Sequence, residues 1–229
     1  SETDADVDVA VINTCSVTST SDQKSRQMIR RLVSHYPNAV IVAMGCYVQM
    51  SAAFVETIPG VDIIIGTSDR HMIPDLVEQY LKDGKKRNIV AESTRDLTYE
   101  ELKVTSYSDN TRAYLKIQDG CDNFCSYCII PFARGRLRSR QKEAILQEVH
   151  QLVDAGFQEI VLTGIHTGGY GRDLGNYSFT DLVKDILKEE PRLYRLRISS
   201  IEESEITDEL ISLMKTNTVI AHHLHMPIQ

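Results

Sequence analysis

Three of the five cysteines stand close together between Gly120 and Cys128, with the spacing C-x3-C-x2-C. Three thiolates within eight residues can converge on one metal centre. A structural zinc or an ordinary iron–sulfur cluster takes four protein ligands, so three leave one position open for a substrate or cosubstrate. Buried apolar cysteines, or a zinc knuckle that borrows a fourth ligand, are the alternatives. The spacing favours an iron–sulfur site, with zinc as the main rival.

The other two cysteines, Cys15 and Cys46, each follow an apolar run that is typical of a buried strand. Two cysteines this far apart are by themselves more typical of buried small residues than of ligands. Their place at the ends of consecutive strands is the informative feature, because open α/β sheets bind their ligands at the carboxyl ends of the strands.

An arginine-rich run follows the three clustered cysteines. It sits in a basic region, because seven basic and only two acidic residues lie from Arg112 to Lys142 in a chain whose net charge is −7. A solvated helix or loop face would explain such a run equally simply. Its position favours binding of phosphates or of a carboxylate by bidentate hydrogen bonds. The candidate substrate-binding residues are Arg134, Arg136, Arg138 and Arg140.

Composition indicates a globular protein without membrane segments, since 42% of the residues are hydrophobic and no apolar run approaches the roughly 18–20 residues that span a bilayer. The chain opens with acidic, polar residues, unlike a signal peptide. An odd number of clustered cysteines does not suggest disulfides. We therefore expect a reducing, cytoplasmic location. Because the chain does not begin with Met and ends at Gln229, we expect it to be a piece of a longer protein.

The first half of the chain alternates strand-like and helix-like segments, which predicts an α/β domain with a small parallel sheet. We place this domain at residues 1–90 and a polar linker, which follows a brief apolar Asn88–Val90, at residues 91–110. The predicted strands are Val7–Thr14, Ala39–Met44 and Val61–Ile65. The predicted helices are Gln23–His35, capped by Ser19 or Ser21, then Ala52–Thr57 and Met72–Lys82.

The second half, residues 111–229, shows four further strand–helix units, as in a partial (β/α) barrel with its chemistry at the strand C-terminal ends. Predicted strands are Ala113–Gln118, Glu159–Thr163, Leu193–Ser199 and His222–Met226; predicted helices are Lys142–Ala155, Thr180–Lys188 and Ile206–Met214. Residues at or near the strand ends are candidate cosubstrate contacts, although Ser and Thr there also cap helices. They are Thr163, Gly164, Ser200, Glu202 and His225.

With Tyr127 before its last cysteine, the C-x3-C-x2-C run resembles the signature of radical S-adenosylmethionine enzymes. The resemblance implies that Cys121, Cys125 and Cys128 hold a [4Fe–4S] cluster. Its open iron would bind S-adenosylmethionine, and one-electron reduction would cleave that cosubstrate to a 5′-deoxyadenosyl radical. It also implies that Tyr127 borders the adenine of the cosubstrate.

Longer motifs resemble the methylthiotransferase family in particular. They are Gly120–Pro131 with Arg134-Gly135 and Arg138-Ser139-Arg140, Asn13-Thr14-Cys15, Gly45-Cys46, Thr163–Gly171 and Ile198–Glu202. The resemblance implies a second, auxiliary [4Fe–4S] cluster on Cys15, Cys46 and a third cysteine that this sequence lacks. It also implies methylthiolation at C2 of N6-threonylcarbamoyladenosine, next to the anticodon of tRNA.

The implied partners are the tRNA anticodon loop, an electron donor and a sulfur donor. Within the same family, isopentenyl-adenosine in tRNA or a ribosomal-protein aspartate are alternative substrates. A non-enzymatic iron–sulfur or zinc protein that binds RNA is the alternative from another class. Because the third auxiliary cysteine is missing, we expect the chain as given to be inactive alone.

Overall fold

The computed structural model describes residues 7–101 and 111–227. Part of the predicted linker, residues 102–110, lies outside this range. The chain divides into two compact units. The N-terminal unit comprises residues 1–100 and 123–135, and the C-terminal unit comprises residues 101–122 and 136–229. Residues 123–135, which include Cys125 and Cys128, are therefore grouped with the N-terminal sheet, whereas Cys121 belongs to the C-terminal unit.

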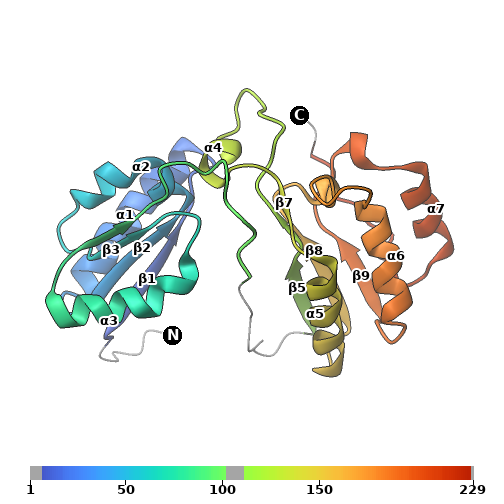
Figure 1. Ribbon diagram of the computed structural model, residues 1–229, viewed down its shortest axis with the longest axis horizontal. Coiled ribbons are helices and arrows are strands. Elements are labelled where there is room, and N and C mark those ends of the chain that lie inside the picture. Colours follow the sequence, from blue (N-terminus) through green and yellow to red (C-terminus); the bar gives the residue numbers. More distant parts are fainter. Residues whose placement is uncertain (1–6, 102–110, 228–229) are drawn as a thin grey trace. The chain divides into compact units, whose positions relative to one another are not determined.

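The N-terminal unit is built on a four-stranded parallel sheet in the order β1-β2-β3-β4 (Figure 1). The three predicted strands are confirmed, and β4 is added from the short apolar run that was expected to precede the linker. Only three residues long, β4 is defined by its pairing with β3 rather than by its own hydrophobicity. The bounds are β1 Val9–Thr14, β2 Val40–Gly45, β3 Ile63–Ile65 and β4 Arg87–Ile89.

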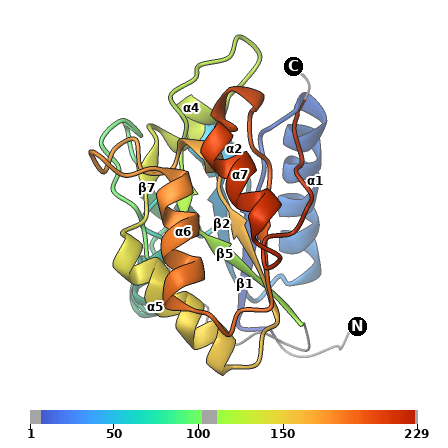
Figure 2. The same ribbon diagram turned by 90° about the vertical axis from the view of Figure 1, so that its right-hand side faces the viewer.

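Helices cover both faces of this sheet. One face packs against α1 and α2 through Ile29, Tyr47 and Val55, and the other packs against α3 through Leu76 and Val77. Figures 1 and 2 show α1 and α3 on opposite sides of the strands. The bounds are α1 Ser19–His35, α2 Cys46–Glu56 and α3 Ile73–Asp83.

Two helix starts differ from the prediction. The cap of α1 is Thr18, whose Oγ1 accepts a hydrogen bond from the Ser21 backbone N–H at 3.0 Å. Helix α2 begins at Cys46, six residues before the predicted start. Its first three residues are all buried and show no amphipathic spacing, so the sequence did not mark this start. Ser51 then departs from helical geometry with φ of −138°, which splits the helix into two short parts.

Segment 123–135 carries a short helix, α4 (Ile130–Arg134), that packs within the N-terminal unit. The Thr67 hydroxyl donates to the Ala133 carbonyl at 2.8 Å, and the Thr94 hydroxyl donates to the Phe132 carbonyl at 2.9 Å. Gly135 has φ of 78° and lies so close to the Thr94 carbonyl that a Cβ atom would overlap it. The backbone segments at Gly135 and Thr94 therefore cross in direct contact.

The C-terminal unit contains a three-stranded parallel sheet in the order β5-β8-β9 and a small antiparallel pair, β6-β7. Its helices pack on the sheet around one core that includes Leu115, Leu162 and Ile186 (Figure 2). The predicted α/β class with parallel sheets is confirmed. The bounds are β5 Arg112–Lys116, β6 Gln118–Asp119, β7 Arg138–Ser139, β8 Glu159–Thr163, β9 Arg195–Ile198, α5 Lys142–Asp154, α6 Phe179–Glu189 and α7 Asp208–Thr216.

The strand predicted at His222–Met226 is wrong. Within that run one isolated parallel bridge forms, between Ser200 and His225, and another, between Leu196 and Ile220, lies just before it. The His223 backbone N–H donates to the Ala221 carbonyl at 2.7 Å, so the chain turns instead of extending. The histidines of this run are exposed and give the segment little apolar surface to bury against the sheet.

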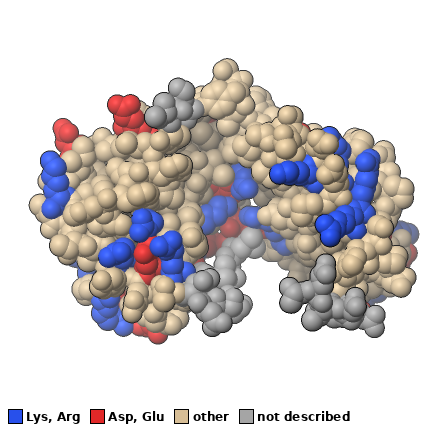
Figure 3. Space-filling model, turned by 180° about the vertical axis from the view of Figure 1, so that it is seen from behind, with Lys and Arg blue, Asp and Glu red and all other residues tan. Residues whose placement is uncertain are grey.

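The surface of α1 is basic. Lys24, Arg30 and Arg31 are exposed on it, and Figure 3 shows Lys and Arg side chains spread over the N-terminal unit in the view from behind. These three side chains belong to the solvated face of the helix. Among the residues that the structure describes, no helix is both long enough and apolar enough to cross a membrane.

Candidate functional site

The carboxyl edge of the N-terminal sheet brings Cys15 and Cys46 to matching positions. Strands β1 and β2 are parallel neighbours, and Thr14 is paired with Gly45. Each cysteine is therefore the residue that directly follows one member of the last pair. Cys15 is exposed, whereas Cys46, the first residue of α2, is 7% exposed. This is the edge at which a parallel α/β sheet binds its ligands.

Hydrogen bonds that involve the backbone hold this edge. The Thr14 hydroxyl donates to the Met44 carbonyl at 2.6 Å and accepts from the Val48 N–H at 3.3 Å. The Ser25 hydroxyl of α1 donates to the Cys15 carbonyl at 2.9 Å and accepts the Cys15 N–H at 3.3 Å. Both cysteine-bearing turns are thus tied to neighbouring elements.

Gly45 is required by the geometry of its turn. Its φ is 103°, a value that side chains disfavour, and a Cβ atom would lie 2.5 Å from both the Asn13 Oδ1 and the Thr14 carbonyl oxygen. The Gly45-Cys46 pair therefore reflects a backbone constraint next to the thiol. The structure thus explains why a glycine precedes Cys46.

Two of the clustered cysteines, Cys125 and Cys128, belong to the same compact unit as Cys15 and Cys46. They lie in an irregular loop in which the Cys128 N–H donates to the Cys125 carbonyl at 2.9 Å. Cys125 is exposed and Cys128 is partly exposed. Tyr127 between them is 68% exposed, so its ring is available on the surface of the loop.

Aromatic rings also flank this loop within the N-terminal unit. Phe124 and Phe132 are each 56% exposed. Their rings meet edge to face, with centroids 5.6 Å apart. Both rings are therefore accessible on the surface of the N-terminal unit.

Cys121 belongs to the C-terminal unit, where side chains surround it. Gln118 is fully buried just before it; its side-chain NH₂ donates to the carbonyls of Asp119 at 2.7 Å and Gly120 at 2.6 Å. The Gln118 Oε1 accepts the His166 backbone N–H at 2.8 Å. A single side chain thus links the start of the cysteine loop to the loop that follows β8.

His166 stands between Cys121 and an acidic partner. Its Nδ1 lies 3.7 Å from the Cys121 Sγ, and its Nε2 forms an ion pair with Glu205. The side chains of His166 and Glu205 are 5% and 2% exposed. The hydrogen bonds to Cys121 and to Glu205 raise the pKa of His166 to about 9. Arg172, at 2.9 Å from Glu205, completes the chain of charges.

The strand-end candidates lie at the carboxyl edge of β8 and β9. Thr163 ends β8 and is followed by Gly164, and both are partly exposed. Ser200 and His225 meet directly, with the Ser200 Oγ 2.7 Å from the His225 Nδ1, and both are exposed. Glu202 instead caps the one-turn helix at Glu203–Glu205, in a reciprocal capping box with Glu205.

The four candidate arginines differ sharply in environment. Arg138 and Arg140 are buried, at 8% and 5% exposure. Arg140 is paired with Glu101 at 2.8 Å and with Glu148 at 2.5 Å, and Arg138 lies 3.5 Å from Asp119. Arg136 is exposed and Arg134 is partly exposed. Arg136 is therefore the exposed member of the run, Arg134 is intermediate, and Arg138 and Arg140 brace the C-terminal unit.

The cysteines can be tested as cluster ligands on their chemistry. All five lie in the described part of the chain and none forms a disulfide. Within residues 7–101 and 111–227, no three His, Cys, Asp or Glu side chains are gathered as a metal-binding group. The three thiols of the Cys121–Cys128 loop are nonetheless only partly buried or exposed, on backbone without regular structure, and thiolates are the ligands that iron–sulfur clusters take. The donor set fits such a cluster.

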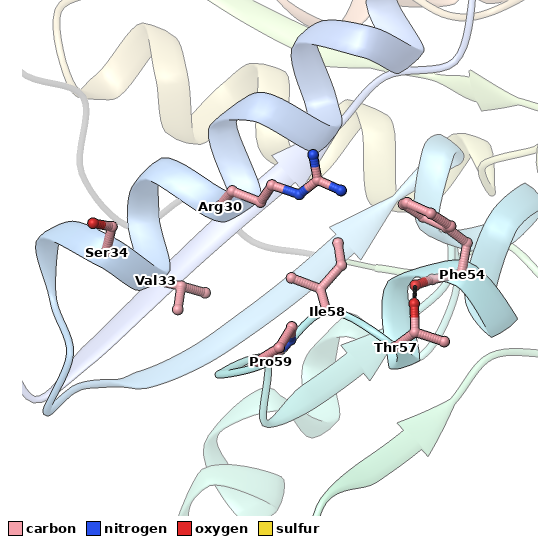
Figure 4. A pocket seen from close by; sticks show the side chains of 7 residues that line it. All are labelled: Arg30, Val33, Ser34, Phe54, Thr57, Ile58 and Pro59. Atoms are coloured by element: carbon pink, nitrogen blue, oxygen red, sulfur yellow. Dashed lines mark hydrogen bonds between the residues drawn. The ribbon is translucent and has the colours of Figure 1, made fainter.

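A pocket of about 290 Å³ lies elsewhere in the N-terminal unit (Figure 4). It is lined by the last turns of α1 and the end of α2, with Arg30 and Phe54 at its sides. These helix ends return to the amino edge of the parallel sheet, away from Cys15 and Cys46. The pocket is therefore separate from the thiol site.

Three of the residues described above were not among the predicted site residues. His166 lies in a glycine-rich run after a strand, and a titratable side chain at that place was a signal that could have identified it. Gln118 is a polar residue at the end of a predicted strand and gave a weaker signal. Glu205 gave none, because it reaches the site from a helix that follows a different strand.

Comparison with known families places the fold and the cysteine motif together. A model of the Radical SAM superfamily matches residues 115–229, half of the chain. The chain belongs to this superfamily, whose cofactors are a [4Fe–4S] cluster and S-adenosylmethionine. A second model, described as uncharacterized protein family UPF0004, matches residues 1–66, which include Cys15 and Cys46.

Among curated relatives, the chain is 51% identical over 222 residues to the threonylcarbamoyladenosine tRNA methylthiotransferase MtaB of Bacillus subtilis, covering 97% of this chain and 49% of the relative. The Thermotoga maritima protein of the same name is 36% identical, with 96% and 49% covered. A tRNA-2-methylthio-N(6)-dimethylallyladenosine synthase of Dictyoglomus thermophilum is 33% identical, with 100% and 52% covered. The chain thus spans about half the length of these relatives.

A solved structure shares the fold. The radical S-adenosylmethionine methyltransferase TsrM of Kitasatospora setae, with cobalamin and a [4Fe–4S] cluster bound, matches with a TM-score of 0.62 at 16% identity. The match covers 89% of this chain and 46% of that chain. At this identity the likeness concerns the fold alone.

Proposed function

We propose that this chain is the catalytic part of a tRNA methylthiotransferase, which adds a methylthio group at C2 of N6-threonylcarbamoyladenosine next to the anticodon. The observation that carries the proposal is the pairing of two cysteine sets in a chain 51% identical to a protein with that named activity. Cys125 and Cys128 share a compact unit with Cys15 and Cys46, which supports joint action of the two sets.

Cys121, Cys125 and Cys128 would hold the cluster that binds S-adenosylmethionine, and Cys15 and Cys46 would supply two ligands of an auxiliary cluster. When bound, the first cluster supplies one-electron reductive cleavage of the cosubstrate. The auxiliary cluster is the proposed carrier of the inserted sulfur. The remaining work of this chain is to position the cosubstrate and the base, and to exclude water from both.

Cosubstrate contacts fall on residues at the strand ends. Tyr127 offers an exposed ring for the adenine, and Thr163, Gly164 and the Ser200–His225 pair offer polar groups at the edge of β8 and β9. Glu202 is the sixth proposed contact. Glu202 caps the one-turn helix at Glu203–Glu205, so it lies on the loop after β9 that also carries Ser200.

The RNA contacts combine charge and stacking. Arg136 and Arg134 are the more exposed members of the arginine run and would bind phosphates, whereas Arg138 and Arg140 would keep the loop in place. Phe124 and Phe132 present exposed rings on which an unstacked base of the anticodon loop can stack. Turning the target base out of its stack would also expose its C2 atom, which is otherwise hidden in the folded loop. We place the protein in the cytoplasm with an electron donor and a sulfur donor as further partners.

Anaerobic reconstitution of the full-length protein tests the proposal. We expect about eight iron atoms per chain, four for each cluster, and release of 5′-deoxyadenosine on reduction with S-adenosylmethionine. One zinc and no cosubstrate cleavage would support the RNA-binding scaffold instead.

The substrate is tested with two matched tRNAs that carry either threonylcarbamoyl- or isopentenyl-adenosine at the same position. Mass spectrometry of the nucleosides should find the methylthio group on the threonylcarbamoyl form. The group on the isopentenyl form, or on neither, would refute the proposed substrate.

A further inference from the structure

A three-residue chain of contacts reaches Cys121 from inside the C-terminal unit. Glu205 is paired with the His166 Nε2, and the His166 Nδ1 lies 3.7 Å from the Cys121 Sγ, within hydrogen-bonding range for sulfur. All three residues belong to the same compact unit. Neither His166 nor Glu205 has a part in the function proposed above.

Each ring nitrogen of His166 faces one partner. The Nε2 lies in the ion pair with Glu205, and the Nδ1 faces the Cys121 sulfur. A thiolate that ligates a cluster has no hydrogen to donate, so it can only accept a hydrogen bond from the Nδ1 edge of the ring. The geometry therefore makes the Cys121 sulfur the acceptor of this contact.

The ring is held firmly enough for this role. The His166 backbone N–H is bound to the buried Gln118 side chain at 2.8 Å, which fixes the depth of the residue in the unit. Its side chain is 5% exposed, so water does not compete for either nitrogen, and Arg172 holds Glu205 from the outer side at 2.9 Å. A buried, anchored donor keeps a fixed orientation toward its acceptor.

We propose that His166 is a positioning residue for the cluster, which donates an N–H···S hydrogen bond to the ligand Cys121 and raises the reduction potential of the [4Fe–4S] cluster, with Glu205 holding the ring. The inference rests on the proposed function in one respect, that Cys121 is a cluster ligand. Hydrogen bonds to cluster sulfurs are among the factors that set such potentials, and outer-shell partners commonly orient metal ligands.

The direction of the effect follows from charge. An added electron increases the negative charge on the cluster and its thiolates. A hydrogen-bond donor stabilises that charge, so it favours the reduced state over the oxidised one. Loss of the donor should therefore make the cluster harder to reduce.

The test uses the full-length protein with Cys15→Ala and Cys46→Ala, so that only the Cys121 cluster titrates. The midpoint potential is measured in an anaerobic redox titration followed by the electron paramagnetic resonance of the reduced cluster. His166→Phe, which keeps a ring but removes both N–H groups, should lower the reduced-to-oxidised ratio about tenfold at a given potential, or about 59 mV for one electron. Glu205→Gln should shift the potential less, in the same direction.

His166→Gln keeps an N–H donor and should recover part of the shift. Thr167→Val is the matched control, because Thr167 is a buried neighbour of His166 whose hydroxyl lies 3.2 Å from the Ser199 hydroxyl. Its potential should equal that of the parent protein.

An unchanged potential in a His166→Phe protein that still holds four iron atoms would overturn the inference and leave the proposed function standing. If His166→Phe does not retain its cluster, His166→Gln and Glu205→Gln decide, and parental potentials in both would overturn it. A parent protein that binds zinc in place of the cluster would refute the proposed function first.

Discussion

In the N-terminal unit, Cys15 and Cys46 are placed by the backbone, whereas in the C-terminal unit Cys121 is surrounded by side chains. Paired strand ends, the positive φ of Gly45 and a serine bound to the Cys15 backbone hold the first two. Gln118, His166 and Glu205 form the second environment. A backbone scaffold fixes where a ligand lies. A side-chain scaffold also adjusts its electronic properties, so the two cysteine sets should respond differently to mutation.

The largest difference is expected when the thiols themselves are removed from the full-length protein. Changing Cys121, Cys125 and Cys128 to Ala together should reduce 5′-deoxyadenosine release to the background without enzyme. Changing Cys15 and Cys46 to Ala should leave part of this release and abolish methylthiolation of tRNA. Chromatography of the nucleosides and of the cosubstrate products measures both, and equal loss of both activities in the two variants would contradict the division of roles.

A change in the backbone scaffold should be the next largest effect. Gly45→Ala combines a positive φ with a Cβ 2.5 Å from two oxygen atoms, and we expect it to lower the free energy of unfolding by about 3 kcal/mol. Denaturant unfolding of the chain measures this. Gly84→Ala is the control, since it also has a positive φ but open space around it, and should cost about 1 kcal/mol. Equal costs would show that the close approach at Gly45 relaxes freely.

The arginine run allows a comparison of inward and outward side chains. Arg140→Met leaves the mostly buried Glu148 without its cation, and we expect this to destabilise the chain by about 2 kcal/mol. The loss of the pair between Arg140 and Glu101 should add little, because the Glu101 side chain is exposed to solvent. Arg136→Ala should change the stability by less than about 0.5 kcal/mol.

For tRNA binding, unlike stability, the exposed Arg136 should matter more than the buried Arg140. Arg136→Ala should weaken tRNA binding and lower the slope of log affinity against log salt by about one, as expected for the loss of one phosphate contact. Fluorescence anisotropy at several salt concentrations measures the slope. A full-length Arg136→Ala protein that binds tRNA as tightly as the parent would remove Arg136 from the interface.

The smallest effect concerns acid stability of the C-terminal unit. A hydrogen bond from Arg192 lowers the pKa of Glu190 from 4.5 to about 2. A lowered carboxyl pKa stabilises the fold above pH 4.5, and this contribution is lost as the pH falls toward 2. Because Arg192 is half exposed, we expect about 1 kcal/mol. Glu190→Gln should remove this part of the pH dependence in urea unfolding, and an unaltered acid limb would argue against it.

The sequence predicted the strands well where they are nearly continuous apolar runs. Strand β2 is buried throughout, whereas β1 and β8 are apolar enough to be recognised although some of their residues are exposed or half-buried. Strand β4 and the pair β6-β7 were missed because two or three residues carry no periodicity, and only pairing with a neighbour makes them strands. The run His222–Met226 failed in the opposite way: its spacing resembled a strand, but its exposed histidines have nothing to bury.

At the site, cysteine spacing predicted the type of ligand but not its surroundings. Residue type could not separate Arg136 from Arg140, because burial depends on acidic partners, Glu101 and Glu148, that are distant in sequence. Glu205 could not be predicted for the same reason, since its contact with His166 joins the loops that follow two different strands, β8 and β9. Such long-range partners emerge only when the chain is folded.

The backbone crossing at Gly135 bears on how this chain tolerates mutation. Thr94 approaches so closely that any side chain at position 135 would overlap its carbonyl. In a library selected only for folded protein, with no demand for activity, this codon should still return glycine. Deep mutational scanning would then separate the Arg134-Gly135 pair into two kinds of constraint, one set by the architecture and the other by the RNA.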